Sequence, residues 1–418
     1  MNRQIAPDIK TIKSIKTGFP LASGRMFFIP SDEGVFKLDI VFPKSGYGVT
    51  ENKFISSYAV DLLLSGTANK SSSEIATEID FHGGFVFKNS DFYTSSLTIY
   101  GMNEKFQILF ELVKEYYENC IYSLDELNIF KERKISELNI NLGKTSFLAN
   151  RGINQLILGE DHPYSKPADQ DIIRSIESSQ LLDYKKNRLI EPYFIFTGSA
   201  STEAEKVIEN LGYNLKTLVT GDLNEIIPQE TAETEKKIIK QDSTQSSIRM
   251  GKIMPSREHE DYFKISMCNL ILGGYFGSRL MKNIREEKGL TYGIHSSITP
   301  FKNFSLFKIS SECNSDLSET VRQEIYNEIK ILQTELVGQE ELTTAKNYLS
   351  GHMMRNFDGA FNISDRFKGI MELDTKDPDA YYRNYFNTIN KVTSEEIKEI
   401  ANNYLNINTL KYCISGAN

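Results

Sequence analysis

The stretch NIREEKGLTYGIHSS, residues 283–297, places two hydrogen-bond donors at a joint in the chain. A charged helical run ends at Gly289, a strand-like run follows directly, and Arg285 and Tyr292 stand on either side. Glycine permits a tight reversal here, so both side chains could point into one space. Two structural explanations compete with a functional one. Arginine is favoured in the last turn of a helix, and an aromatic strand residue commonly packs on the core.

No other set of residues offers a catalytic pattern. The five histidines are dispersed, and no two of them have the four-residue spacing that puts metal ligands on one helical face. The GKTS stretch at 143–146 lacks the upstream glycine of a phosphate-binding loop. The TGSAS stretch near residue 198 lacks the second glycine of a nucleophile elbow. The residues alone therefore indicate a protein with no visible catalytic centre.

The composition excludes several classes of function. The chain has 418 residues, 25% of them charged, with a net charge of −8 and no basic block, which argues against nucleic-acid binding. No run approaches the roughly 20 apolar residues that span a bilayer, so we expect no membrane association. The first residues show no apolar signal region, and the four cysteines are widely separated, as expected for free thiols in a reducing compartment. We therefore expect a cytoplasmic protein.

The elements that must position the pair recur twice along the chain. A polar, charged stretch at 222–242 contains Pro228 and predicts a linker. It separates two domains, expected at 1–224 and 236–418. Each contains, in order, a strand, two helices, two strands and two helices, which indicates a duplication. The predicted fold class is α+β: two duplicated halves, each a mainly antiparallel sheet with helices packed on one face. The predicted ranges are 38–42, 51–66, 71–84, 85–91, 93–101, 103–120 and 124–142, then 246–254, 259–274, 278–289, 290–298, 304–313, 316–336 and 339–357.

These motifs resemble the insulinase/pitrilysin family of metallopeptidases, the inverzincins. The resemblance is carried by ILGGYFGSRLMKNIREEKGLTYGIHSSI at 271–298, HEDYFKISMCNLILGG at 259–274, HPYSKP at 162–167 and FHGGF at 81–85, and it covers nearly the whole chain. It implies that each chain forms half of a clamshell. It also implies that Arg285 and Tyr292 are the Arg/Tyr pair that helps hold the scissile carbonyl of a peptide substrate.

The zinc motif of this family is missing. Aligning on Gly66–Thr67 places the stretch 57–61, SYAVD, where catalytic members carry HxxEH. Both histidine ligands and the glutamate base are thus replaced. Glu137 lies near the expected position of the third ligand, and Phe87 replaces an expected asparagine. A catalytic zinc site needs three protein ligands, so we expect no metal in this chain.

The resemblance therefore implies a division of labour between two chains. We expect the non-zinc subunit of a heterodimeric zinc metallopeptidase that is inactive alone. A homologous HxxEH-containing partner would bring the zinc, and Arg285 and Tyr292 would bind peptide substrates and stabilise the oxyanion. Two alternatives remain open: a catalytically silent structural or assembly subunit, and a homodimer that captures peptides without cutting them.

Overall fold

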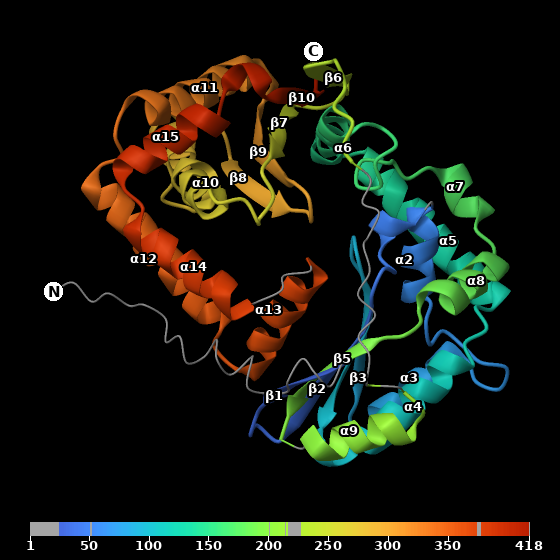
Figure 1. Ribbon diagram of the computed structural model, residues 1–418. Coiled ribbons are helices and arrows are strands. Elements are labelled where there is room, and N and C mark those ends of the chain that lie inside the picture. Colours follow the sequence, from blue (N-terminus) through green and yellow to red (C-terminus); the bar gives the residue numbers. More distant parts are fainter. Residues whose placement is uncertain are drawn as a thin grey trace.

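The computed structural model describes residues 25–50, 52–199, 201–213, 215, 227–373 and 378–417. The chain forms two lobes, each built around one five-stranded sheet (Figure 1). Strand order is β1-β5-β2-β4-β3 in the first sheet and β6-β10-β7-β9-β8 in the second. The two orders correspond strand for strand, and this confirms the predicted α+β class and the duplication.

Both sheets are mainly antiparallel. One outer pair in each is parallel, β1 with β5 and β6 with β10, and the remaining pairs are antiparallel. The strands are β1 Met26–Pro30, β2 Val35–Phe42, β3 Phe85–Ser90, β4 Ser95–Met102, β5 Tyr193–Gly198, β6 Glu235–Ile239, β7 Gln245–Met254, β8 Gly293–Pro300, β9 Ser305–Asn314 and β10 Lys411–Gly416.

The helices of the first half follow local sequence signals. Helix α3 begins with a capping box in which the Ser71 hydroxyl accepts from the Glu74 N–H and the Glu74 carboxylate accepts from the Ser71 N–H. The helices are α2 Lys53–Asp61, α3 Ser72–Phe81, α4 Phe106–Glu118, α5 Leu124–Leu142, α6 Thr145–Leu158, α7 Gln170–Ser175, α8 Ser178–Arg188 and α9 Ser201–Asn210, with short 3-10 turns at Tyr47–Val49 and Asn103–Lys105.

The second half contains two π-helical segments, η4 and η5, where regular helices were predicted. They flank the loop that leads to Arg285. The elements are α10 Tyr262–Asn269, η4 Leu270–Gly274, η5 Met281–Glu287, α11 Ser318–Thr334, α12 Gln339–Asn356, α13 Ala360–Glu372, α14 Pro378–Lys391 and α15 Ser394–Tyr404, with 3-10 turns at Ser315–Leu317 and Ile407–Thr409.

The predicted linker at 222–242 is only partly accounted for. Residues 216–226 lie outside the described residues. Glu235–Ile239, however, forms strand β6 and pairs in parallel with β10, so the linker prediction is wrong for this stretch. Its charged side chains masked the strand, because an outer strand with one solvated face needs few apolar residues. The boundaries at 224 and 236 stay predictions.

Each half lends one helix to the other. Helix α6 packs on β7, β10 and β6 of the second sheet, and α13 packs on β1 and β5 of the first. Figure 1 shows both crossings, with α6 beside β7 and β10 and α13 beside the first sheet. Each sheet therefore carries its own helices on one face and a helix of the other half on the opposite face.

An aromatic cluster joins the two halves where these crossings meet. The ring of His162, in the predicted HPYSKP loop, stacks on Phe92 with centroids 5.8 Å apart and meets Phe301 edge-on at 6.3 Å. His162 is buried, with its Nδ1 accepting from the Tyr164 N–H at 3.2 Å. This histidine thus has a packing role at the junction of the halves.

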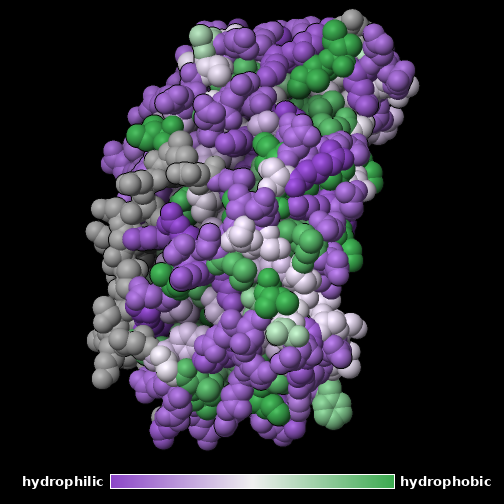
Figure 2. Space-filling view, turned by 90° about the vertical axis from the view of Figure 1, so that its right-hand side faces the viewer, coloured by the Kyte–Doolittle hydropathy of each residue, from purple (hydrophilic) through white to green (hydrophobic). Residues whose placement is uncertain are grey.

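The outer surface is mostly polar. On the side shown in Figure 2 hydrophilic residues dominate, and hydrophobic residues gather in small, separate groups. Within the described residues, no helix is both long and apolar enough to cross a membrane. The four cysteines are all buried free thiols.

Candidate functional site

The joint between η5 and β8 is a tight reversal. The N–H of Lys288 donates to the carbonyl of Asn283 at 3.0 Å, and the N–H of Leu290 donates to the carbonyl of Ile284 at 2.9 Å. Gly289 lies between these two bonds with a φ of +63°, a left-handed conformation that favours glycine. The predicted role of Gly289 as the turning residue is confirmed.

Arg285 lies in the last turn of η5 and is half-buried. Its guanidinium sits over the ring of Phe276, 5.4 Å from the ring centroid. Among the described residues, no hydrogen bond or ion pair involves Arg285. A guanidinium has five N–H donors, so in this structure the side chain keeps those donors available.

Tyr292 immediately precedes β8, and 68% of its surface is exposed. Its backbone N–H donates to the carbonyl of Glu312 at 3.3 Å, which fixes the residue to β9. The explanation that Tyr292 packs on the core is therefore wrong. Core packing falls instead to Ile284 and Ile294, which are fully buried on either side of the joint.

The π-helical segments are a second sign of function here. Wider π turns are rare and frequently occur at functional sites. Segment η4 packs on β8, and a Cβ on Gly273 would lie 2.6 Å from the Ser296 hydroxyl oxygen. Only glycine fits this close approach. Segment η4, which leads into the loop 275–280, is thus held tightly against the strand that follows Tyr292.

The first-half helix that aligns with HxxEH is α2. Tyr58, Ala59 and Val60 are buried in the core, and Ser57 is half-buried with its hydroxyl donating to the Lys53 carbonyl at 3.3 Å. Burial and the nearby carboxylates raise the pKa of Tyr58. As predicted, the polar residues 57 and 61 form the edge of an otherwise buried helix.

A lysine bridges the carboxylates that remain near this helix. The Lys134 ammonium lies 3.7 Å from Asp61 Oδ2 and 3.4 Å from Glu137 Oε2, and Arg133 lies 3.8 Å from Glu137. Two carboxylates that face ammonium and guanidinium groups do not fit a zinc site, which needs three protein ligands. Among the described residues, no group of three or more His, Cys, Asp or Glu could hold a metal ion.

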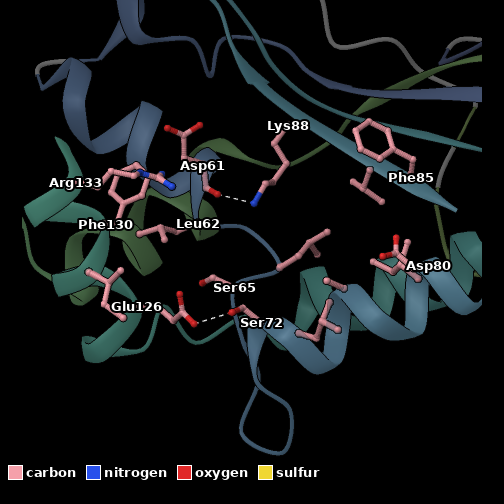
Figure 3. A pocket seen from close by; sticks show the side chains of 16 residues that line it. Asp61, Leu62, Ser65, Ser72, Asp80, Phe85, Lys88, Glu126, Phe130 and Arg133 are labelled. Atoms are coloured by element: carbon pink, nitrogen blue, oxygen red, sulfur yellow. Dashed lines mark hydrogen bonds between the residues drawn. The ribbon is translucent and has the colours of Figure 1, made fainter. Parts of the chain in front are cut away.

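A cavity of about 390 Å³ opens beside this helix, between the end of α2, α3, β3 and α5 (Figure 3). Its lining is largely apolar, with Phe85 and Phe130 at two sides. The Lys88 ammonium donates to the carbonyls of Asp61 and Leu63 at 2.5 and 2.8 Å, and burial lowers its pKa. On the opposite side, the Ser72 hydroxyl donates to Glu126 at 2.7 Å. The first half thus offers an apolar pocket with fixed polar edges.

Sequence reasoning identified Arg285 and Tyr292 but missed their surroundings. Phe276 was overlooked, although an aromatic residue between two glycine-containing motifs, in GGYFGSRL, is a visible signal. Lys134 was also overlooked, because it lies 73 residues from Asp61 and only the fold brings the two together. The half-buried Arg285 and the exposed Tyr292 and Phe276 form the candidate site of the second half. The cavity beside α2 forms that of the first half.

The fold and these sites define a duplicated α+β protein with one candidate site in each half. Residues 176–349 match the family model described as the peptidase M16 inactive domain. In sequence, the chain is 22% identical over 323 residues to an uncharacterized zinc protease of Bacillus subtilis, YmxG, covering 73% of this chain and 74% of that protein. It is 23% identical over 346 residues to a protein of Helicobacter pylori named a non-peptidase homolog, YmxG, covering 76% and 77%.

Solved structures share the whole fold. A peptidase M16 inactive domain from Pseudomonas fluorescens superimposes with a TM-score of 0.83 at 20% identity, covering 95% of this chain and 97% of that one. The periplasmic protease PqqL from Escherichia coli superimposes with a TM-score of 0.74 at 12% identity, covering 95% of this chain and 45% of PqqL. Residues 176–349 thus match the M16 inactive domain, the chain as a whole shares the fold of these solved structures, and residues 57–61 read SYAVD where HxxEH was sought.

Proposed function

We propose that this chain is the non-zinc subunit of a heterodimeric metallopeptidase. Arg285 and Tyr292 would face the zinc site of a homologous partner chain that carries HxxEH. The proposal rests on a difference between the two halves: one presents hydrogen-bond donors, and the other lacks the zinc ligands. The second half presents Arg285 with no charged partner among the described residues and Tyr292 in an exposed position, whereas the first half has lost both histidine ligands.

In the proposed complex, the partner supplies the metal-activated nucleophile and the general base. Arg285 and Tyr292 bind the carbonyl oxygen of the scissile peptide bond. As the carbonyl carbon becomes tetrahedral, negative charge develops on this oxygen, and the N–H and O–H donors stabilise it. Because Gly289 fixes the path between η5 and β8, the donors need no large rearrangement before reaction.

The size of related proteins supports a two-chain arrangement. The chain covers 45% of PqqL, so this fold also occurs as part of a protein about twice as long. A second chain of the same fold would bring this chain to a comparable size. A partner with an intact zinc motif would restore the metal that this chain lacks.

Reconstitution tests this proposal. We expect the chain to co-purify with a homologous chain that carries HxxEH, and expect the pair to cleave unstructured peptides. This chain alone should show no cleavage. Cleavage by the partner alone at the full rate of the pair would contradict the proposal, and so would activity of this chain alone that survives extensive chelation.

The cavity beside α2 favours a second candidate, a homodimer that captures peptides without cutting them. β3 is the outer strand of its sheet, and Phe85 and Phe87 on it are 60% and 54% exposed. An extended peptide could pair with this strand and place an apolar side chain in the cavity. Binding of a fluorescent apolar peptide to the isolated chain, lost in Phe85→Asp, would favour this candidate. Absence of both peptide binding and cleavage would favour a silent structural or assembly subunit.

A further inference from the structure

Phe276 occupies an unusual place for a large apolar side chain. It lies in the loop between η4 and η5, and 65% of its surface is exposed. Single exposed aromatic residues are common on protein surfaces, so exposure alone indicates nothing. Its contact is informative: the ring lies under the Arg285 guanidinium at 5.4 Å.

The loop that carries Phe276 is firmly held. Arg279 Nε and Nη2 donate to the two carboxylate oxygens of Glu341 on α12, at 2.8 and 2.9 Å. The ring of Tyr275 packs on Tyr348 of the same helix, with centroids 4.9 Å apart. Leu280, at the end of the loop, is fully buried. The position of Phe276 is therefore set by the fold on both sides.

An aromatic ring holds a guanidinium differently from a carboxylate. A carboxylate would accept two of the N–H donors and neutralise the charge. A ring face attracts the cation through its quadrupole and leaves the donors at the edge of the guanidinium plane available. For a residue that must donate to a substrate oxygen, this is the more suitable support.

We propose that Phe276 is a positioning residue for Arg285: its ring holds the guanidinium in place while leaving the donors available for the substrate carbonyl. This inference rests on the proposed function for its catalytic consequence. The contact between the two side chains can be tested independently. At an exposed site a cation–π contact contributes about 0.5–1 kcal/mol, which corresponds to about a two- to fivefold effect.

The first experiment measures the contact in the full chain alone. NMR relaxation of the Arg285 Nε–Hε group reports the order of this side chain. We expect Phe276→Leu to lower the order of Arg285, and Phe276→Tyr, which keeps the ring, to retain it. Phe81→Leu is the matched control, because Phe81 is 83% exposed and its ring lies edge-on to that of the neighbouring His82 in the first half. Equal Arg285 order in wild type and Phe276→Leu would overturn the proposal.

The second experiment measures turnover in the reconstituted peptidase. We expect Phe276→Leu to lower kcat about two- to fivefold with little change in KM, and to have no further effect when Arg285→Ala is already present. A loss of equal size in both backgrounds would show that Phe276 acts apart from Arg285 and would overturn the proposal. If Arg285→Ala left turnover unchanged, the proposed function would fail, while the NMR result would still decide on the contact.

Discussion

At the scale of single residues, the two halves differ in how their charges are paired. Near α2, Asp61 and Glu137 both face Lys134, at 3.7 and 3.4 Å. Near β8, Arg285 has no such partner among the described residues and rests on an aromatic ring. The carboxylates near α2 are thus neutralised by a side chain of the same protein, whereas the N–H donors of Arg285 near β8 stay available for a ligand. This contrast is the reason to assign substrate contact to the second half.

The isolated chain should not retain zinc. Position 57 is a serine whose hydroxyl bonds within its own helix, and position 60 is a buried valine. Of the four positions that align with the zinc ligands and the base, Asp61 and Glu137 alone carry carboxylates, and both face Lys134. After dialysis against trace zinc, elemental analysis should give well below one zinc per chain. A chain with HxxEH, treated in parallel, is the control. Stoichiometric zinc in the isolated chain would contradict this assignment.

Residue types predicted part of this site and not its contacts. The spacing of Arg285, Gly289 and Tyr292 indicated a turn with two donors, because the left-handed conformation of a glycine is a local property. The exposure of Tyr292, the support from Phe276 and the bridge through Lys134 depend on tertiary packing. Packing of this kind leaves no signal in the spacing of a single sequence.

At the scale of elements, the joint between η5 and β8 determines how Arg285 lies relative to Tyr292. Most predicted helices and strands are confirmed, because amphipathic spacing and caps such as Ser71 with Glu74 are local signals. The π-helical form of η4 and η5 was not predicted, since an extra residue per turn barely changes apolar periodicity. Strand β6 was missed because its exposed charges resemble those of a linker.

Gly289→Ala should strain this joint. At a φ of +63° an L-residue costs about 1–2 kcal/mol, although a Cβ would meet no atom within 4 Å. We expect lower stability in chemical denaturation and weaker activity of the complex. Gly293→Ala is the matched control, since a Cβ at that position also has open space and its φ is not left-handed. Equal effects of the two substitutions would show that backbone conformation at Gly289 is unimportant.

At the scale of the whole molecule, the exchange of α6 and α13 couples the halves. On the first sheet, Lys37 and Asp39 are buried and 3.1 Å apart, and both contact α13 through Ser364 at 3.4 and 3.2 Å. The sequence predicted the duplication because it repeats the order of elements. The exchange was not predictable, since it joins residues far apart in the sequence, by 102 positions from Thr145 of α6 to Ser247 and by 327 positions from Lys37 to Ser364 of α13. The Lys37 ammonium also pairs with Asp365 of α13, and Lys368 of α13 lies 3.6 Å from Asp39. Separating the halves would break both of these pairs at buried charges, which favours one arrangement of the halves.

The α13 contact should weaken as pH rises. The Thr94 hydroxyl donates to the Glu372 carboxylate at 2.8 Å, and burial, followed by the nearby Asp91, raises the pKa of Glu372 from 4.5 to about 7. Lys368 opposes this shift, and Asp39 adds to it. A carboxyl whose pKa is raised by folding binds more protons in the folded state, so stability falls between pH 4.5 and 7 and stays lower above.

Glu372→Gln tests this dependence, because the amide keeps a group that can accept from Thr94 and cannot ionise. We expect the variant to match wild type near pH 5 and to be more stable at pH 8, by about 1–3 kcal/mol. Thermal unfolding at several pH values measures the difference. A constant difference across this range would contradict the assignment to Glu372.

The most direct test of the central claim is the turnover of the reconstituted peptidase with Arg285→Ala in this chain. If Arg285 stabilises the oxyanion opposite the partner's zinc, kcat should fall about 100- to 1000-fold. The heterodimer, measured by size-exclusion chromatography with light scattering, should remain intact. Full turnover in an intact Arg285→Ala heterodimer would contradict the claim that this chain supplies half of the active site.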